Sequence, residues 1–112
     1  MSVRLELRIL PAVEGDLRLQ SQYYLDTAGQ DIADRFFGSF EDAIEHILTR
    51  PGTGTPFDTS LVRLAGLRSW PLNGFADIRL YYRLVDGCVE AVRLLHGKRD
   101  LARELTEEES TR

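Results

Sequence analysis

The sequence is poor in cysteine, in histidine and in net positive charge, and each shortage narrows the choice of function. Cys88 is the only cysteine, so the chain has no internal disulfide and no cysteine cluster for a metal. Its two histidines are not at the spacing of metal ligands, and we expect no metal and no other cofactor. Low cysteine usage fits a reducing cytoplasm. No hydrophobic run approaches the length of a membrane span, so we expect no membrane partner.

The charge balance is acidic, with 14 lysines and arginines against 18 aspartates and glutamates, a net charge of −4. Nucleic-acid binding depends on basic patches that release counterions, so this balance disfavours a nucleic-acid partner. Much of the acid lies near the end of the chain, and we interpret the tail from about residue 106 as a solvated helix end. Residues 1–112 show no repeat and no linker, which predicts one domain large enough to fold without disulfides.

The first half of the chain predicts one strand and two helices. Aliphatic residues alternate with charged ones over residues 2–10, which is the period of a strand. Pro11 suits the first position of a helix that runs to about residue 27, and Gly29 supplies its left-handed end. The next helix carries an apolar stripe at helical spacing, made of Ile32, Phe36, Phe40, Ala43 and Ile47. The short joint between them implies two antiparallel helices side by side.

The second half predicts three strands and a last helix. Residues 51–60 are rich in Gly, Thr and Pro and are expected to be a connector. Strands are expected at residues 62–72, with an interruption, at 77–85 and at 88–95, the last two joined by an Asp86-Gly87 turn. A helix should follow at 101–107. The expected fold is α+β: a helical hairpin packed on a mostly antiparallel four-stranded sheet, in the order β-α-α-β-β-β-α. The first strand should lie parallel to a later one.

Counting outward from Asp86-Gly87 sorts the hairpin side chains onto two faces. The face expected against the helices holds Ile78, Leu80, Tyr82, Leu84, Val89, Ala91 and Leu95. The second face holds Arg79, Tyr81, Arg83, Glu90, Val92, Leu94 and His96. Arg93 is a misfit on the first face and is expected near the sheet margin. Arg83 stands opposite Glu90, which predicts an ion pair, whereas Arg79 has no acid opposite.

The second face is more apolar than a solvated face should be. Aliphatic residues mixed with arginine and tyrosine are typical of protein-binding surfaces. The alternative is that the C-terminal segment folds over them. His96 and Arg99 lie at a strand end and turn, where sites tend to gather. No nucleophile and base have supporting context, so the pattern identifies no catalytic residue.

Three segments carry a resemblance to a known family. They are "LRSWP" at residues 67–71, "YYR" at 81–83 and "LHGKRDLA" at 95–102. The sequence resembles the ParE branch of the ParE/RelE toxin superfamily over nearly the whole chain, best after Gly66. The resemblance implies the fold described above and the toxin of a bacterial type II toxin–antitoxin (plasmid stabilisation) system. Such toxins are held inactive by a wrapping antitoxin, which implies a hetero-oligomer. Its contacts are expected at Arg79, Tyr81, Val92 and Leu94.

The superfamily contains two activities. RelE-like members cut messenger RNA on the ribosome, with lysines ahead of the middle strand, an arginine in that strand, an arginine in the "GKR" turn and a tyrosine in the last helix. ParE-like members poison DNA gyrase and have no hydrolytic site. Here Arg79 and Arg99 match the two arginines, but the lysines are absent and Leu105 falls at about the place of the tyrosine.

The resemblance therefore implies a gyrase inhibitor, not an enzyme. Its target-binding residues would be exposed aromatic and basic groups: Arg68, Trp70, His96, Lys98 and Arg99. One alternative is a ribosome-dependent messenger-RNA endoribonuclease that uses Arg79, Arg99 and His96. A second alternative is a non-toxic protein-interaction module of the same fold.

Overall fold

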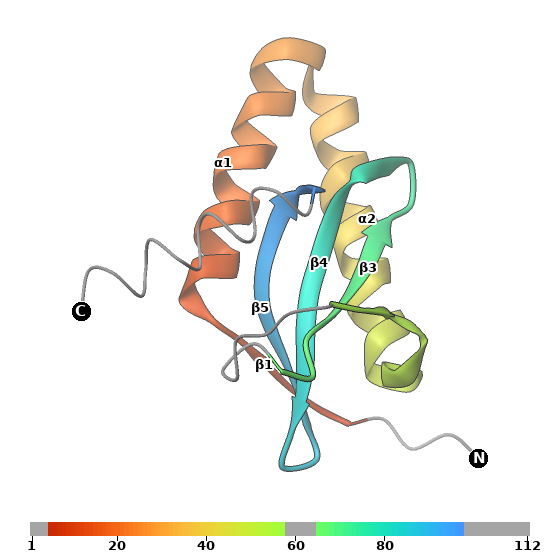
Figure 1. Cartoon of the computed structure of the whole chain (residues 1–112). Helices are drawn as coiled ribbons and strands as arrows, with labels where there is room; N and C mark the ends of the chain where they lie inside the picture. Colours follow the sequence, from red (N-terminus) through yellow and green to blue (C-terminus); the bar gives the residue numbers. More distant parts are fainter. Residues whose placement is uncertain (1–4, 58–64, 98–112) are drawn as a thin grey trace.

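A computed structural model of the chain describes residues 5–57 and 65–97 (Figure 1). The elements follow in the order β1 (Glu6–Ile9), α1 (Pro11–Ala28), α2 (Gln30–Thr49), a 3₁₀ turn η1 (Pro51–Thr53), β2 (Thr55–Pro56), β3 (Arg68–Leu72), β4 (Phe75–Val85) and β5 (Cys88–His96). The two helices form a hairpin that lies against one face of the sheet (Figure 1). The other face, which neither helix covers, is called the open face below.

In the described part of the chain the sheet has five strands, in the order β1-β5-β4-β3-β2. Of these strands only β1 and β5 pair in parallel, so the predicted α+β fold and the mostly antiparallel sheet are confirmed. The prediction of four strands is wrong, because Thr55 and Pro56 add a short strand beside β3. Proline is tolerated there because an edge strand leaves one row of N–H groups unpaired. The predicted last helix, and all of the predicted strand before Ala65, lie outside the described residues.

The helices begin and end as their sequence predicts. Pro11 opens α1, and Gly29 closes it at φ 94° with its N–H bonded to the carbonyls of Tyr24 and Leu25. The stripe on α2 is buried at Phe36, Phe40, Ala43 and Ile47, while Ile32 is half-buried. The core between helices and sheet consists of Val13, Phe36, Phe40, Ala43, Ile44, Ile47, Leu48, Leu72, Ile78, Leu80, Tyr82, Val89, Ala91 and Leu94.

The β4–β5 hairpin departs from simple counting halfway along. Asp86 and Gly87 both have positive φ, 51° and 76°, as the tight turn requires, and the expected pairs hold as far as Tyr82 with Ala91. Tyr81 then pairs with Arg93, so β5 has one extra residue, a β-bulge. The shift reverses the faces beyond it.

Because of the bulge, three expected placements are wrong. Leu94 is fully buried in the core on the helix side, and Leu95 lies on the open face instead. His96 pairs with Ile78 and lies on the helix side, not on the open face. A fourth placement fails for another reason. Leu84 alternates toward the helix side but is 56% exposed, because the hairpin end extends past the helices (Figure 1).

Arg93 lies at the sheet margin, as expected, and it is buried there in an ion pair. Its Nε and Nη2 each donate to Asp16 of α1 over 2.8 Å. β1 ends at Ile9, so on the edge away from β4 this part of β5 has no strand beside it among the described residues, and α1 supplies the missing hydrogen bonds. Asp16 accepts the Leu94 N–H at 2.9 Å, and Gln20 Nε2 donates to the Leu94 carbonyl at 2.7 Å. The helix thereby seals an open sheet edge.

Candidate functional site

The open face carries a small apolar cluster in its middle. Leu67, Tyr81 and Leu95 are buried there, with Phe57 and Val92 half-buried against them. The Tyr81 ring meets Phe57 edge-on with centroids 6.3 Å apart, and its hydroxyl donates to the Gly97 carbonyl at 3.2 Å. Tyr81 thus packs beneath its neighbours, whereas Val92 reaches the surface. Of the residues expected to contact an antitoxin, Leu94 is on the wrong face and Tyr81 is fully buried.

Arg79 is a basic residue of the open face whose guanidinium is held by hydrogen bonds to β2 and β3. Its Nε donates to Ser69 Oγ at 2.8 Å, and its Nη2 lies 3.4 Å from Thr55 Oγ1 and from the Ser69 carbonyl. These neutral oxygens fix the guanidinium across β3 without cancelling its charge. Within residues 5–57 and 65–97 it meets no carboxylate, so it can still pair with an anion.

The remaining charges of this face neutralise one another in part. Arg83 Nε lies 2.9 Å from Glu90 Oε1, which confirms the expected ion pair, and Arg8 Nη1 lies 3.4 Å from Glu90 Oε2. Glu90 is buried while Arg8 is mostly exposed. Two arginines therefore share one carboxylate, and the three strands β1, β5 and β4 are tied together. This triad does not make the face strongly basic.

Trp70 lies on the helix side of the sheet, not on the open face. It pairs with Leu80 of β4 and packs half-buried against the core. The His46 ring of α2 stacks on the indole at a centroid distance of 4.0 Å and an angle of 15°. His46 Nε2 also lies 2.9 Å from Thr53 Oγ1 in η1. The Trp70 indole therefore projects from β3 toward α2 at the margin of the core.

Arg68 and Tyr82 hold the turn that precedes β2. Arg68 Nη1 donates to the Gly54 carbonyl at 2.8 Å, and the Tyr82 hydroxyl donates to Pro51 and accepts the Gly54 N–H. A side chain at Gly54 would collide with the Tyr82 ring, so only glycine fits. Burial raises the pKa of Tyr82 above its usual value of about 10, while the Gly54 N–H and Arg68 act in the opposite direction.

His96 is exposed at the end of β5 and lines a hollow on the α1 side. The hollow is also lined by Leu19, Gln20, Tyr23 and Tyr24. Gln20 Oε1 is buried and has no hydrogen-bond partner among the residues that the structure describes. Arg79 belongs to the open face, so the structure does not bring His96 and Arg79 together, as the nuclease alternative would need. Lys98 and Arg99 lie outside the described residues.

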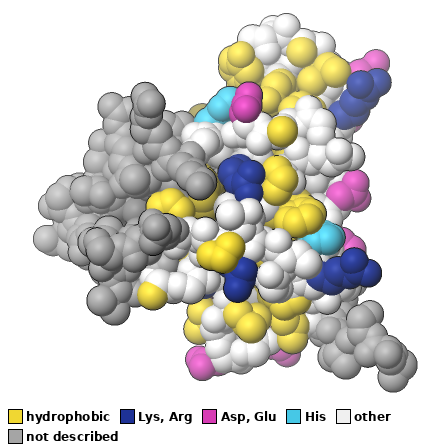
Figure 2. All heavy atoms as spheres, turned by 45° about the vertical axis from the view of Figure 1, so that its right-hand side comes forward, with side chains coloured by type: hydrophobic (Ala, Val, Ile, Leu, Met, Phe, Trp, Pro, Cys, Tyr) yellow, Lys and Arg dark blue, Asp and Glu magenta, His cyan; other side chains and the backbone are white. Residues whose placement is uncertain are grey.

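The expected target-binding set is therefore divided. Arg68 and Trp70 lie on the helix side, His96 lies near α1, and none of the three shares a surface with Arg79. On the side that carries α2 and β3, Figure 2 shows basic side chains scattered singly among hydrophobic ones instead of gathered in one patch. Across the described ranges, no group of three or more His, Cys, Asp or Glu residues is placed to hold a metal. Neither helix is long and apolar enough to cross a membrane, as far as the structure describes the chain.

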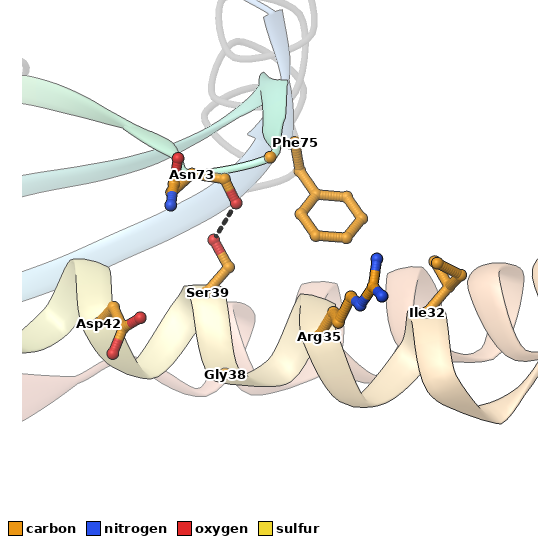
Figure 3. Close-up of a pocket in the computed structure, with 8 residues that line it drawn as sticks. Ile32, Arg35, Gly38, Ser39, Asp42, Asn73 and Phe75 are labelled. Atoms are coloured by element: carbon orange, nitrogen blue, oxygen red, sulfur yellow. Dashed lines mark hydrogen bonds between the residues drawn. The ribbon is translucent and has the colours of Figure 1, made fainter.

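Sequence reasoning missed a hollow of about 450 Å³ between α2 and the β3–β4 turn (Figure 3). It is lined by Ile32, Arg35, Gly38, Ser39, Asp42, Asn73, Gly74 and Phe75. The sequence signal was the presence of Arg35, Gly38 and Asp42 at spacings of three and four, which places them along one side of α2.

Comparison with known proteins points to one family. The model of the family described as the ParE toxin of the type II toxin–antitoxin system parDE matches residues 7–101. No curated protein matches the sequence.

Several solved structures share the fold. A chromosomal ParDE toxin–antitoxin system from P. aeruginosa superimposes with a TM-score of 0.69 at 13% identity, covering 85% of this chain and 98% of that one. The toxin–antitoxin complex RelBE2 from Mycobacterium tuberculosis gives 0.57 at 23% identity, with 84% and 92% covered. The YoeB dimer from Staphylococcus aureus gives 0.55 at 18% identity, with 84% and 98% covered.

Proposed function

Because the chain belongs to the ParE toxin family of type II toxin–antitoxin systems, we propose that it inhibits DNA gyrase by binding to it and that a cognate antitoxin neutralises it. The family match over residues 7–101 carries this proposal. The "LRSWP" and "LHGKRDL" segments support it, since they resemble the gyrase-poisoning branch. Gyrase and the ribosome both work in the bacterial cytoplasm, which is where this protein would act.

The charges of the open face favour binding over RNA cleavage. Cleavage by attack of a 2′-hydroxyl group needs a base and several cations around one phosphate. Arg79 lacks a base beside it among the described residues, and His96 faces a different hollow. Arg8 and Arg83 are engaged by Glu90. A net charge of −4 also opposes entry into a phosphate-rich site.

The antitoxin would cover the open face. Solved relatives of the fold include toxin–antitoxin complexes, RelBE2 and YoeB–YefM. In this chain, Val92 and Phe57 offer half-buried apolar surface and Arg79 offers an unneutralised charge. An antitoxin segment with an aliphatic side chain next to a carboxylate would match both. The result would be a hetero-oligomer in which the toxin is masked.

The test compares two activities of the purified protein: inhibition of gyrase supercoiling and ribosome-dependent cleavage of a message. We expect inhibition of supercoiling and no cleavage. Arg79→Ala and Arg18→Ala are compared in both assays, since Arg18 is an exposed arginine of α1 far along the chain from this face. Message cleavage that vanishes in Arg79→Ala but persists in Arg18→Ala, with supercoiling untouched, would contradict the proposal.

One observation favours the nuclease as the second candidate. The Arg79 guanidinium is pre-positioned by Ser69 and keeps its charge, which is what stabilisation of a phosphate would need. The same assay pair separates the two functions. A protein inactive in both assays would instead be an interaction module that has lost toxicity.

A further inference from the structure

The groove along α2 contains two opposite charges that nothing in the described chain neutralises. Arg35 and Asp42 are both exposed, and neither has an ion-pair or hydrogen-bond partner within residues 5–57 and 65–97. They are seven residues apart on one helix, a rise of about 10 Å, so they do not pair with each other. Figure 3 shows them on either side of Gly38. We call this hollow the α2 groove.

The α2 groove is a built feature with fixed walls. Ser39 Oγ donates to the Asn73 carbonyl at 2.7 Å, which anchors the β3–β4 turn above the helix. Gly38 leaves the middle of the floor open, since a Cβ there would meet nothing within 4 Å. Phe75 forms an apolar wall near Arg35 (Figure 3), and its ring is held edge-on by Phe36 at 5.4 Å. The charges are therefore presented on rigid elements.

We propose that the α2 groove is the surface through which this toxin docks on its target. The fitting partner is a folded protein surface with an acidic side chain for Arg35, a basic side chain about 10 Å away for Asp42, and an apolar group between them against Phe75. Charge complementarity selects this partner, because a surface with the charges reversed would be repelled at both ends. The inference rests on the proposed function and assigns that function to specific residues.

The α2 groove and the open face differ in charge and in apolar surface, and this difference indicates which partner each one binds. A segment that folds around its partner needs a broad apolar surface to offset the entropy of ordering. On the open face, Phe57 and Val92 are half-buried apolar side chains that pack on Leu67, Tyr81 and Leu95, and an antitoxin segment can cover them. The α2 groove is short and charged at both ends, which suits contact between two preformed surfaces. The target and the antitoxin therefore recognise different sides of the toxin.

Two charge reversals and two matched controls test this assignment. The variants are Arg35→Glu and Asp42→Lys; the controls are Arg18→Glu on α1 and Glu41→Lys, which adjoins Asp42 but does not line the groove. All four residues are exposed, so the thermal melts should match that of the natural sequence. We expect each groove variant to inhibit gyrase supercoiling at least about tenfold more weakly, and the controls to keep full potency.

Antitoxin binding and growth arrest complete the experiment. Co-purification with the antitoxin should be unchanged in all four variants, and growth arrest on expression should be relieved only by Arg35→Glu and Asp42→Lys. Unchanged supercoiling inhibition in both groove variants would overturn the inference and leave the gyrase proposal intact. Loss of antitoxin binding in the groove variants would also overturn the inference. The natural sequence could arrest growth without inhibiting gyrase. In that case, relief of growth arrest by the groove variants alone would support the α2 groove as the docking surface for a different target. Growth arrest that persists in the groove variants would overturn the inference. Absence of any toxicity overturns it as well.

Discussion

The two faces of the sheet are built from different interactions. The helix side buries a cluster of fourteen side chains, nearly all apolar, between two helices and three strands. Among the described residues, the apolar cluster of the open face has three buried side chains, and an arginine–glutamate–arginine triad and the hydroxyl contacts of Arg79 lie on the same face. Folding requires the first cluster, since burial of apolar area is the main stabilising term. The cluster on the open face is smaller and contributes less to folding, so its surface can be used for binding a partner.

This difference predicts where substitutions act. On the helix side they should change the free energy of unfolding, because close packing leaves no room for relaxation. On the open face and in the α2 groove they should change binding while the fold persists. The hydrophobic core is thus expected to support the surfaces without contributing to recognition.

The largest effect is expected in the core. Phe40→Ala should cost about 3–5 kcal/mol of unfolding free energy, because Phe40 is buried between α2 and the sheet. Phe37→Ala is the matched control on the same helix: Phe37 is 46% exposed, and its loss should cost about 1 kcal/mol or less. Chemical denaturation of both variants measures the contrast. Equal costs would mean that the phase of α2 is wrong.

The next effect concerns the charged pair that closes the β5 edge. Asp16→Asn keeps an acceptor for the Leu94 N–H but removes the carboxylate charge that pairs with the buried Arg93 guanidinium. We expect a loss of about 3 kcal/mol, the lower end of the range for a broken buried pair. Asp26→Asn, an exposed carboxylate of the same helix, should be close to neutral. A neutral Asp16→Asn would show that α1 does not replace a strand at this edge.

A smaller effect is expected at Tyr82. Tyr82→Phe removes the hydroxyl that serves both Pro51 and the Gly54 N–H, and should cost about 1–3 kcal/mol. Its raised pKa, caused chiefly by burial, also makes stability depend on pH. The neutral phenol contributes stability fully below about pH 10, and this is lost as the pH rises through the higher pKa of the folded state. Denaturation between roughly pH 8 and pH 11 should therefore show a shallower decline in Tyr82→Phe; an unchanged slope would contradict the assignment.

Most of the fold could be predicted from the sequence, because local rules determine it. Pro11 and Gly29 mark helix ends, the α2 stripe marks a buried face, and Asp86-Gly87 requires the left-handed backbone that the turn adopts. Parallel pairing of β1 followed from connectivity alone. Each of these signals acts within a few residues of its effect.

The bulge in β5 could not be found by counting. It needs no glycine and no special residue, so Val92 carries no mark of being the extra one. A signal did exist in combination: Arg93 on a core face and Asp16 on the inner face of α1 are each unfavourable alone and satisfied together. The error put Leu94, Leu95 and His96 on the wrong faces, which changed part of the expected antitoxin and target surfaces. The short strand β2 was missed because two residues give no period.

The central claim is that the open face, and not the helix side, binds the antitoxin. The direct test is the affinity of the antitoxin for Val92→Asp and for Leu84→Asp. Both are partly or largely exposed aliphatic residues of the same hairpin, Val92 on the open face and Leu84 on the other. The account predicts at least about tenfold weaker binding for Val92→Asp and unchanged binding for Leu84→Asp. Full affinity in Val92→Asp, with loss of affinity in Leu84→Asp, would contradict it.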